Sequence, residues 1–215
     1  MAPWLKNDLK DQDLKRIEEA ISSAEKKTRG EIVPMIVRRS STIGHIPIVL
    51  FTISLLLFYI SGLYDYTHEH FEQSWIFTLS WSLLSLPLSI LFSKSPRIQR
   101  AFVNSIDRDL QTQSRALNEF YQANLDKTEG STGILLFISL DDHKAVVLAD
   151  QNISKKLPQK TWDEVVQLLL NGAKKRDLAS GFCDAIKLCG EILEKDFPIL
   201  PDDINELPNH LIIKD

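Results

Sequence analysis

The chain has 215 residues, a formal net charge of −4 and 25% charged residues. This mild acidity argues against a dedicated nucleic-acid binder, which would carry a basic face, so we expect no nucleic-acid partner. The two cysteines, Cys183 and Cys189, are too few for a disulfide framework. Outside a strongly apolar middle stretch, about 165 residues remain, which is enough for one compact domain.

The chain begins with a predicted helix and a predicted strand. Apolar side chains recur at helical spacing over residues 8–28, which indicates an amphipathic helix. Glu31–Val37 is rich in β-branched and apolar residues and predicts a strand. Pro34 within this segment has no N–H to donate to a neighbouring strand. We therefore expect the strand to lie at a sheet edge or to carry a bulge.

Two apolar runs follow, at residues 46–63 and 75–92. Each has 18 residues and contains no Asp, Glu, Lys, Arg or His. As helices they would each be about 27 Å long, close to the ~30 Å hydrocarbon core of a bilayer. With the polar turn 64–74 between them, they predict a transmembrane helical hairpin over residues 44–93. The alternative is a pair of buried core helices, although such helices rarely run so long without a charge.

The distribution of lysine and arginine predicts the orientation of this hairpin. Residues 1–45 carry nine of them, the 64–74 turn carries none, and the chain leaves the second run at Lys94, Arg97 and Arg100. By the positive-inside rule both flanks are cytoplasmic and the turn is extracytoplasmic. We therefore expect a multi-pass protein of the inner, cytoplasmic membrane, with the lipid bilayer as one partner.

A long helix is predicted after the hairpin. Ser95-Pro96 is typical of a helix start. A stripe of apolar residues at helical spacing then predicts that the helix continues to about Asn124. The members of this stripe are Ile98, Phe102, Ile106, Leu110, Leu117, Phe120 or Tyr121, and Leu125.

The remaining elements are two strands, two helices and a tail. Gly133–Leu140 is a nearly all-apolar run and Ala145–Ala149 is its predicted returning strand. Thr161–Lys174 and Ser180–Glu194 have the apolar periodicity of helices. The last twenty residues carry three prolines and predict a mostly extended tail.

Neither flank of the hairpin makes a domain alone, because one helix and one strand cannot bury themselves. We therefore predict that Glu31–Val37 joins the strands of residues 133–149 in one sheet. Residues 1–43 and 94–215 then form one discontinuous cytoplasmic α/β domain, a small sheet flanked by helices. The hairpin of residues 44–93 is an insertion in this domain.

Three aspartates are the strongest candidates for a polar site. Asp141 and Asp142 lie in the predicted turn and Asp150 follows the second strand; their oxygens suit a hard cation. The turn and Asp150 are about 20 Å apart along an extended strand, so one site cannot easily use both. Aspartate in a turn also has a purely local explanation. The chain has no phosphate-binding glycine loop, nucleophile elbow or His-Glu-x-x-His motif.

Four stretches, in their order along the chain, resemble the TPM domain family: EKKTRGEIVPMIV, GILLFISLDDHKAVVLADQNI, GFCDAIKLCGEIL and FPILPDDINELPNHLI. The chain is most similar to the short, membrane-embedded bacterial branch, in which two spans interrupt the domain after its first strand. The resemblance implies a mixed α/β sandwich. The sequence departs from the family pattern at Pro34, and at Gln151-Asn152, where a glycine is common.

The resemblance leaves two functions open. Some lumenal plant members are described as acid phosphatases or calcium-binding proteins, whereas other members look like non-enzymatic assembly factors. We expect a membrane-anchored interaction, assembly or accessory factor with a membrane or cytoplasmic protein partner. The alternative is a metal-assisted phosphatase at the membrane surface. In it, Asp150, with Asp141 or Asp142, would hold a divalent cation such as calcium.

Overall fold

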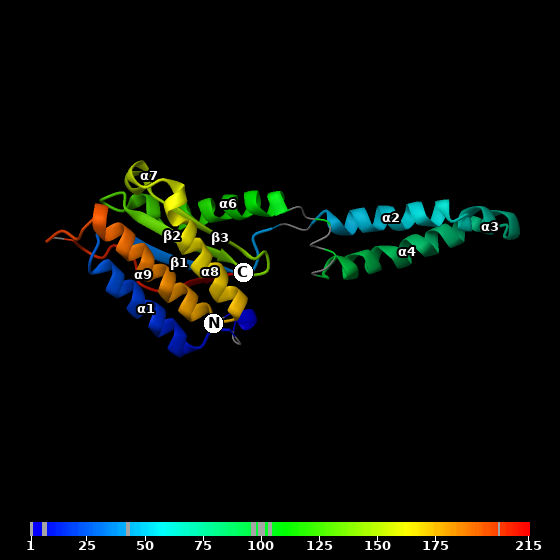
Figure 1. The fold of residues 1–215 in the computed structure, drawn as a ribbon. Coiled ribbons are helices and arrows are strands. Elements are labelled where there is room, and N and C mark those ends of the chain that lie inside the picture. Colours follow the sequence, from blue (N-terminus) through cyan, green and yellow to red (C-terminus); the bar gives the residue numbers. More distant parts are fainter. Residues whose placement is uncertain are drawn as a thin grey trace. The chain divides into compact units, whose positions relative to one another are not determined.

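The computed structural model describes residues 2–5, 8–41, 44–95, 98, 102, 105–201 and 203–215. The chain forms two compact units, which we describe separately. The first comprises Met1–Ser41 and Arg108–Asp215, and the second comprises Thr42–Asp107. The first unit contains the sheet and the helices around it (Figure 1).

A four-stranded mixed sheet is the centre of the first unit. Its strands are β1 (Glu31–Val37), β2 (Gly133–Ser139), β3 (Lys144–Ala149) and β4 (Ile212–Lys214), in the spatial order β3-β2-β1-β4. β1 runs parallel to both β2 and β4, whereas β2 and β3 form an antiparallel hairpin. The predicted fold class and the joining of the first strand to the later hairpin are confirmed.

The prediction that Pro34 marks an edge strand or a bulge is wrong, because β1 pairs on both sides. The pairing with β4 begins only at Met35, however. The amide of Arg38 donates to Lys214 of β4, so even-numbered β1 amides point to the β4 side. The nitrogen of Pro34 therefore faces a side that β4 has not yet reached. On the same side, the Ile32 N–H donates to the Glu25 carboxylate at 2.9 Å.

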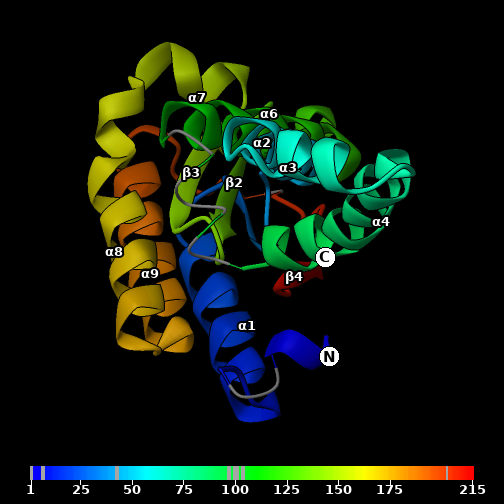
Figure 2. The same cartoon turned by 90° about the vertical axis from the view of Figure 1, so that its right-hand side faces the viewer.

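Three helices cover one face of the sheet: α1 (Asp11–Glu25), α8 (Asp163–Lys175) and α9 (Leu178–Asp196) (Figure 2). Trp162, Leu169, Phe182 and Cys189 from this layer are almost completely buried, as their helical spacing predicts. α8 and α9 approach closely at two glycines. A Cβ atom added to Gly172 would lie 2.6 Å from the Cα atom of Gly181.

Smaller elements complete this unit. They are the helix α7 (Gln151–Lys156) and the 3-10 helices η1 (Pro3–Leu5), η2 (Leu125–Lys127) and η3 (Gln159–Trp162). The tail is mostly without helix, and near its end Ile212–Lys214 forms β4, which pairs with β1.

The other face of the sheet is covered by α6 (Ser105–Gln122). Ala116 and Phe120 of this helix are buried against apolar residues of β1 and β2. Most described members of the predicted apolar stripe are not buried. Ile106, Leu110, Leu117 and Tyr121 are exposed, because α6 turns a different side to the sheet. The predicted helix start at Pro96, with Arg97 and Arg100, lies outside the described residues.

The second unit is a helical hairpin made of α2 (Ile46–Ile60), α3 (Leu63–His70) and α4 (Ser74–Ser93). The first helix ends three residues before the predicted limit of residue 63. Gly62 there adopts a left-handed conformation, with φ of 73°, and α3 departs from α2 at an angle of 56°. The predicted polar turn is therefore mostly helical. The second helix spans residues 74–93, close to the predicted 75–92.

Candidate functional site

The turn between β2 and β3 contains a carboxylate that is saturated with hydrogen bonds. Asp142 is 5% exposed, and its Oδ2 accepts from the amides of Ser40 (2.7 Å) and Ser41 (3.0 Å) and from the hydroxyl of Ser139 (2.7 Å). The Ser40 hydroxyl also donates to Oδ2, at 3.1 Å, and the Ser41 hydroxyl donates to Oδ1. Asp142 thus fastens the segment that leaves β1.

These contacts decide the charge of Asp142. Burial by itself raises the pKa of this carboxyl, but the hydrogen bonds from Ser41, Ser139 and the two backbone amides outweigh it and hold the pKa below its ordinary value of 3.8. The carboxylate is therefore ionised at neutral pH. Its accepting positions are already taken by groups of its own chain.

The neighbouring Asp141 binds the same segment from outside. Its Oδ2 lies 3.0 Å from Nη2 of Arg39 and 3.6 Å from Nε of Arg38, and its backbone N–H donates to the Arg38 carbonyl. Both aspartates of the turn thus hold residues 38–41 to the β2–β3 turn. This use is structural, and it competes with any role in binding a cation.

Asp150 lies at the other end of β3, where it begins α7. Its Oδ1 accepts from the Gln151 N–H at 2.6 Å, as expected of a residue that caps a helix. Its Oδ2 is buried, and within the part of the chain that the structure describes it has no hydrogen-bond partner. The six residues of β3 separate Asp150 from the turn of Asp141 and Asp142, so the three predicted residues are not brought together.

Among the described residues, no group of three or more His, Cys, Asp or Glu side chains is positioned to hold an ion. The two cysteines are not bridged. Burial raises the pKa of both thiols, most strongly for the fully buried Cys189, so both are protonated at neutral pH.

A pocket of about 490 Å³ lies beside the starts of β1 and β2. It is lined by the polar residues Arg29, Glu129, Thr132, Asp203 and Glu206, with Gly130, Leu200, Pro201 and Ile204. Arg29 stacks on the Phe197 ring at 5.6 Å. The side-chain amide of Asn152 donates to the Gly130 carbonyl, so Asp150 and its helix lie at this same end of the sheet.

Two glutamates, Glu31 and Glu25, have raised pKa values near this pocket, and Glu31 fastens the tail to the sheet. The oxygens of Glu31 accept from the amides of Glu206 (3.1 Å) and Leu207 (3.3 Å). Burial raises the pKa of Glu31 above its usual value, against the effect of these hydrogen bonds. Burial and the nearby Glu31 charge also raise the pKa of Glu25 to about 8, although the Ile32 N–H opposes them. The sequence prediction included Asp150 at this end of the sheet but missed the pocket and both glutamates.

In α4 of the hairpin, three serines are buried, whereas most large apolar side chains face outward. Ser85, Ser89 and Ser93 are buried, whereas only 17% of the apolar window of α4 is buried. The exposed members of α4 include Trp75, Leu83, Leu84, Leu91 and Phe92. This packing is opposite to that of a soluble core helix, and small residues between helices are typical of membrane proteins.

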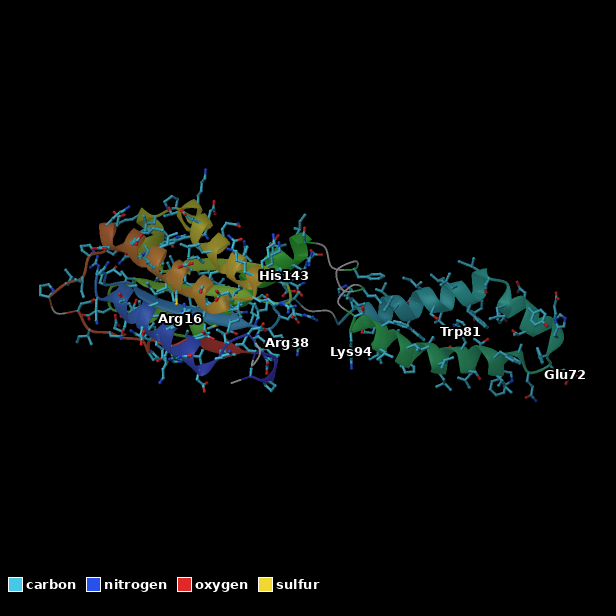
Figure 3. All side chains as sticks on the ribbon, turned by 60° about the horizontal axis from the view of Figure 1, so that its bottom comes forward. Arg16, Arg38, Glu72, Trp81, Lys94 and His143 are labelled. Carbon is cyan, nitrogen blue, oxygen red and sulfur yellow. The ribbon has the colours of Figure 1, made fainter. Side chains whose placement is uncertain are left out.

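Several polar groups of the hairpin find partners within it, although the buried hydroxyl of Thr78 has none among the described residues. The hydroxyls of Ser82, Ser89 and Ser93 donate to carbonyls three or four residues earlier in their own helix. Trp81 lies between the two long helices (Figure 3), stacks on Phe58 at 5.3 Å and donates its Nε1–H to a carbonyl of α2. These internal hydrogen bonds suit a bilayer, because its hydrocarbon core offers polar groups no water to bond with.

Length and composition define how many of the described helices could cross a membrane. α4 alone qualifies, and a second span is added if the bent pair α2 and α3 is counted as one. Figure 3 shows Glu72 and Lys94 at opposite ends of α4, so the ionisable side chains flank this helix and do not interrupt it.

Comparison with known proteins identifies the family of part of this chain. Residues 93–192 match the family model described as the TPM domain. The chain contains a TPM domain. The matched region extends from the end of α4 into α9, so it includes α6, the β2–β3 hairpin and Asp141, Asp142 and Asp150.

One solved structure has a similar fold. The NMR structure of the BA42 protein from the psychrophilic bacterium Bizionia argentinensis aligns with a TM-score of 0.59, covering 96% of this chain and 95% of that one. The sequence identity is 20%, so the likeness concerns the fold alone. No curated protein matches the chain.

Proposed function

We propose that this protein is a membrane-anchored interaction or assembly factor whose TPM domain binds a protein partner. The observation that carries the proposal is the packing of the hairpin, which buries small hydroxyl residues and exposes leucine, isoleucine and aromatic side chains. Exposing so large an apolar surface to water is unfavourable, whereas lipid tails solvate it. The TPM domain would thereby be held at the membrane.

The proposal includes a location and an orientation. The lysines and arginines on both flanks of the hairpin favour a multi-pass anchor in the inner membrane of a bacterium, with residues 64–74 outside. The chain would then belong to the membrane-embedded branch of the family, with its TPM domain split by the hairpin. A cysteine introduced at Glu72 tests the orientation, because an impermeant thiol reagent should label it from outside intact cells. Labelling only after permeabilisation would overturn the orientation.

The pocket at the starts of β1 and β2 is the proposed contact with the partner. Around it, Ile199, Leu200 and Ile204 are 45%, 51% and 75% exposed. Glu129, Asp203 and Glu206 line it beside one basic residue, Arg29. A protein segment that combines apolar side chains with lysine or arginine complements this surface in both polarity and charge.

Photo-crosslinking in native membranes tests this contact. A photoreactive residue at Ile204 should capture a discrete partner, and the same residue at Glu18, exposed on α1, should not. Adding Glu206→Lys, which reverses a pocket charge, should weaken capture at Ile204. Equal capture at both positions, or none at Ile204, would count against the proposed contact.

The metal-assisted phosphatase is the alternative, and one observation favours it. The buried Oδ2 of Asp150 has no partner among the described residues and could accept a ligand. The contacts of Asp141 and Asp142, at the far end of β3, weigh against a shared site. The purified protein should then hydrolyse a phosphoester at a substantial rate, lose this activity on Asp150→Ala, and bind a divalent cation in calorimetry. These results together would favour the phosphatase over the interaction factor.

A further inference from the structure

One side of α6 is apolar and exposed. Ala116 and Phe120 bury another side of the helix against the sheet. The remaining large apolar residues, which we call the α6 stripe, are Ile106 (62% exposed), Leu110 (58%), Leu117 (47%) and Tyr121 (56%). Their separations of four, seven and four residues place all four on one side of a single continuous helix. The apolar arc of α6 is thus wider than the sheet can cover.

The α6 stripe has the same spacing when counted from either end. Ile106 and Tyr121 are equidistant from the midpoint between Gln113 and Ser114, and so are Leu110 and Leu117. We infer that two copies of this chain pair through the α6 stripe, with their α6 helices antiparallel about a two-fold axis at that midpoint. Each Leu110 then meets Leu117 of the second copy, which is the self-matching pattern of a two-fold interface.

The charges on α6 are compatible with this pairing. No charged residue lies on the α6 stripe, and the nearby Asp109 is bound to Lys144 of its own chain at 2.6 Å. Asp107 borders the stripe at one end. The antiparallel arrangement brings it beside Tyr121 of the second copy, whose hydroxyl can donate to a carboxylate. At the axis, Gln113 and Ser114 can hydrogen-bond across the interface.

The exposed area is sufficient for a weak, specific dimer. The four stripe side chains expose roughly 400 Å² per copy, and with Gln113 and Ser114 the pair would bury about 1,000 Å², the low end for specific interfaces. An anionic membrane surface is a poorer occupant, because such surfaces attract basic helices and Asp107 and Asp109 flank the stripe.

Disulfide trapping of the full chain in detergent tests the pairing and its direction. Leu110→Cys and Leu117→Cys, made separately in a background where Cys183 is alanine, should form a crosslinked dimer only when mixed. Ser114→Cys, near the axis, should crosslink to itself. Self-crosslinking of Leu110→Cys without crosslinking to Leu117→Cys would indicate parallel helices and overturn the arrangement, as would the absence of any crosslink.

Sedimentation equilibrium of the same protein measures the strength of pairing. Leu110→Asp should weaken dimerisation at least about tenfold, because it places a charge in a small apolar contact. The control is Gln167→Asp, which places the same new charge at an exposed residue of α8, and it should leave the dimer intact. Circular dichroism of each variant verifies folding. A wild-type protein that stays monomeric at about 100 µM, or equal effects of both variants, would refute the inference.

Discussion

Replacing Glu25 by glutamine should remove most of the pH dependence of the stability of the TPM domain. The Oε1 atom of Glu25 accepts from the Ile32 N–H on the side of β1 where Pro34 and the late start of β4 leave a gap. Its Oε2 is buried without a hydrogen-bond partner among the described residues. A glutamine can keep the first contact through its carbonyl oxygen and carries no charge to desolvate.

The sign and size of the effect follow from proton binding. The pKa of Glu25 is about 8 in the native state against an ordinary value of 4.5, so the folded protein binds this proton more tightly than the unfolded chain does. Unfolding free energy therefore falls as the pH rises from 4.5 to 8, by at most about 1.4 kcal/mol per pH unit. Because Glu25 is partly exposed, we expect a total loss of about 3 kcal/mol over this window.

Hydrogen–deuterium exchange of β1 amides in the full chain measures this free energy between pH 5 and 8.5. Glu25→Gln should match the wild type near pH 5 and exceed it by about 3 kcal/mol near pH 8.5. Glu18→Gln, an exposed change on the same helix, should keep the wild-type slope. An unchanged slope in Glu25→Gln would show that another group is responsible and would refute the reasoning.

Two further substitutions test the packing of the domain. Asp142→Asn should destabilise the domain by about 3 kcal/mol at pH 7, because the amide cannot accept five hydrogen bonds as a charged group does. Since the pKa of Asp142 is lowered, this difference in stability should disappear as the pH falls below 3.8 and the native carboxylate is protonated. The control Asp141→Asn, at a more exposed carboxylate, should cost less than about 1 kcal/mol. Gly172→Ala should raise exchange throughout α8 and α9 and cost about 2 kcal/mol, because its Cβ would meet the Gly181 backbone. Gly44→Ala, which has open space around it, is the control and should change stability little.

The candidate site could be predicted only in part. Composition and turn chemistry pointed to Asp141, Asp142 and Asp150, and local spacing placed the turn and Asp150 at opposite ends of one strand. The sequence could not indicate that Asp142 is occupied by Ser40, Ser41 and Ser139, because two of these donors are about a hundred residues away along the chain. The pocket was missed for the same reason, since it joins Arg29, Glu129 and residues of the tail such as Asp203 and Glu206.

The elements whose signal is local could be predicted from the amino-acid sequence. The 18-residue apolar runs, the all-apolar strand Gly133–Ser139 and the helices with a regular apolar period needed no information from distant residues. The spacing of apolar residues matches the repeat of a helix or a strand within a single segment, so each of these elements can be recognised from its own residues.

Which strands pair, and which side of each helix packs on the sheet, can be seen only in the tertiary structure. It placed β1 inside the sheet despite Pro34, since β4, contributed by the last residues of the chain, pairs with only half of it. It also turned the apolar stripe of α6 outward, because one helix can bury only the side that meets the sheet. Which side that is depends on β1 and β2, and these strands come from segments about a hundred residues apart.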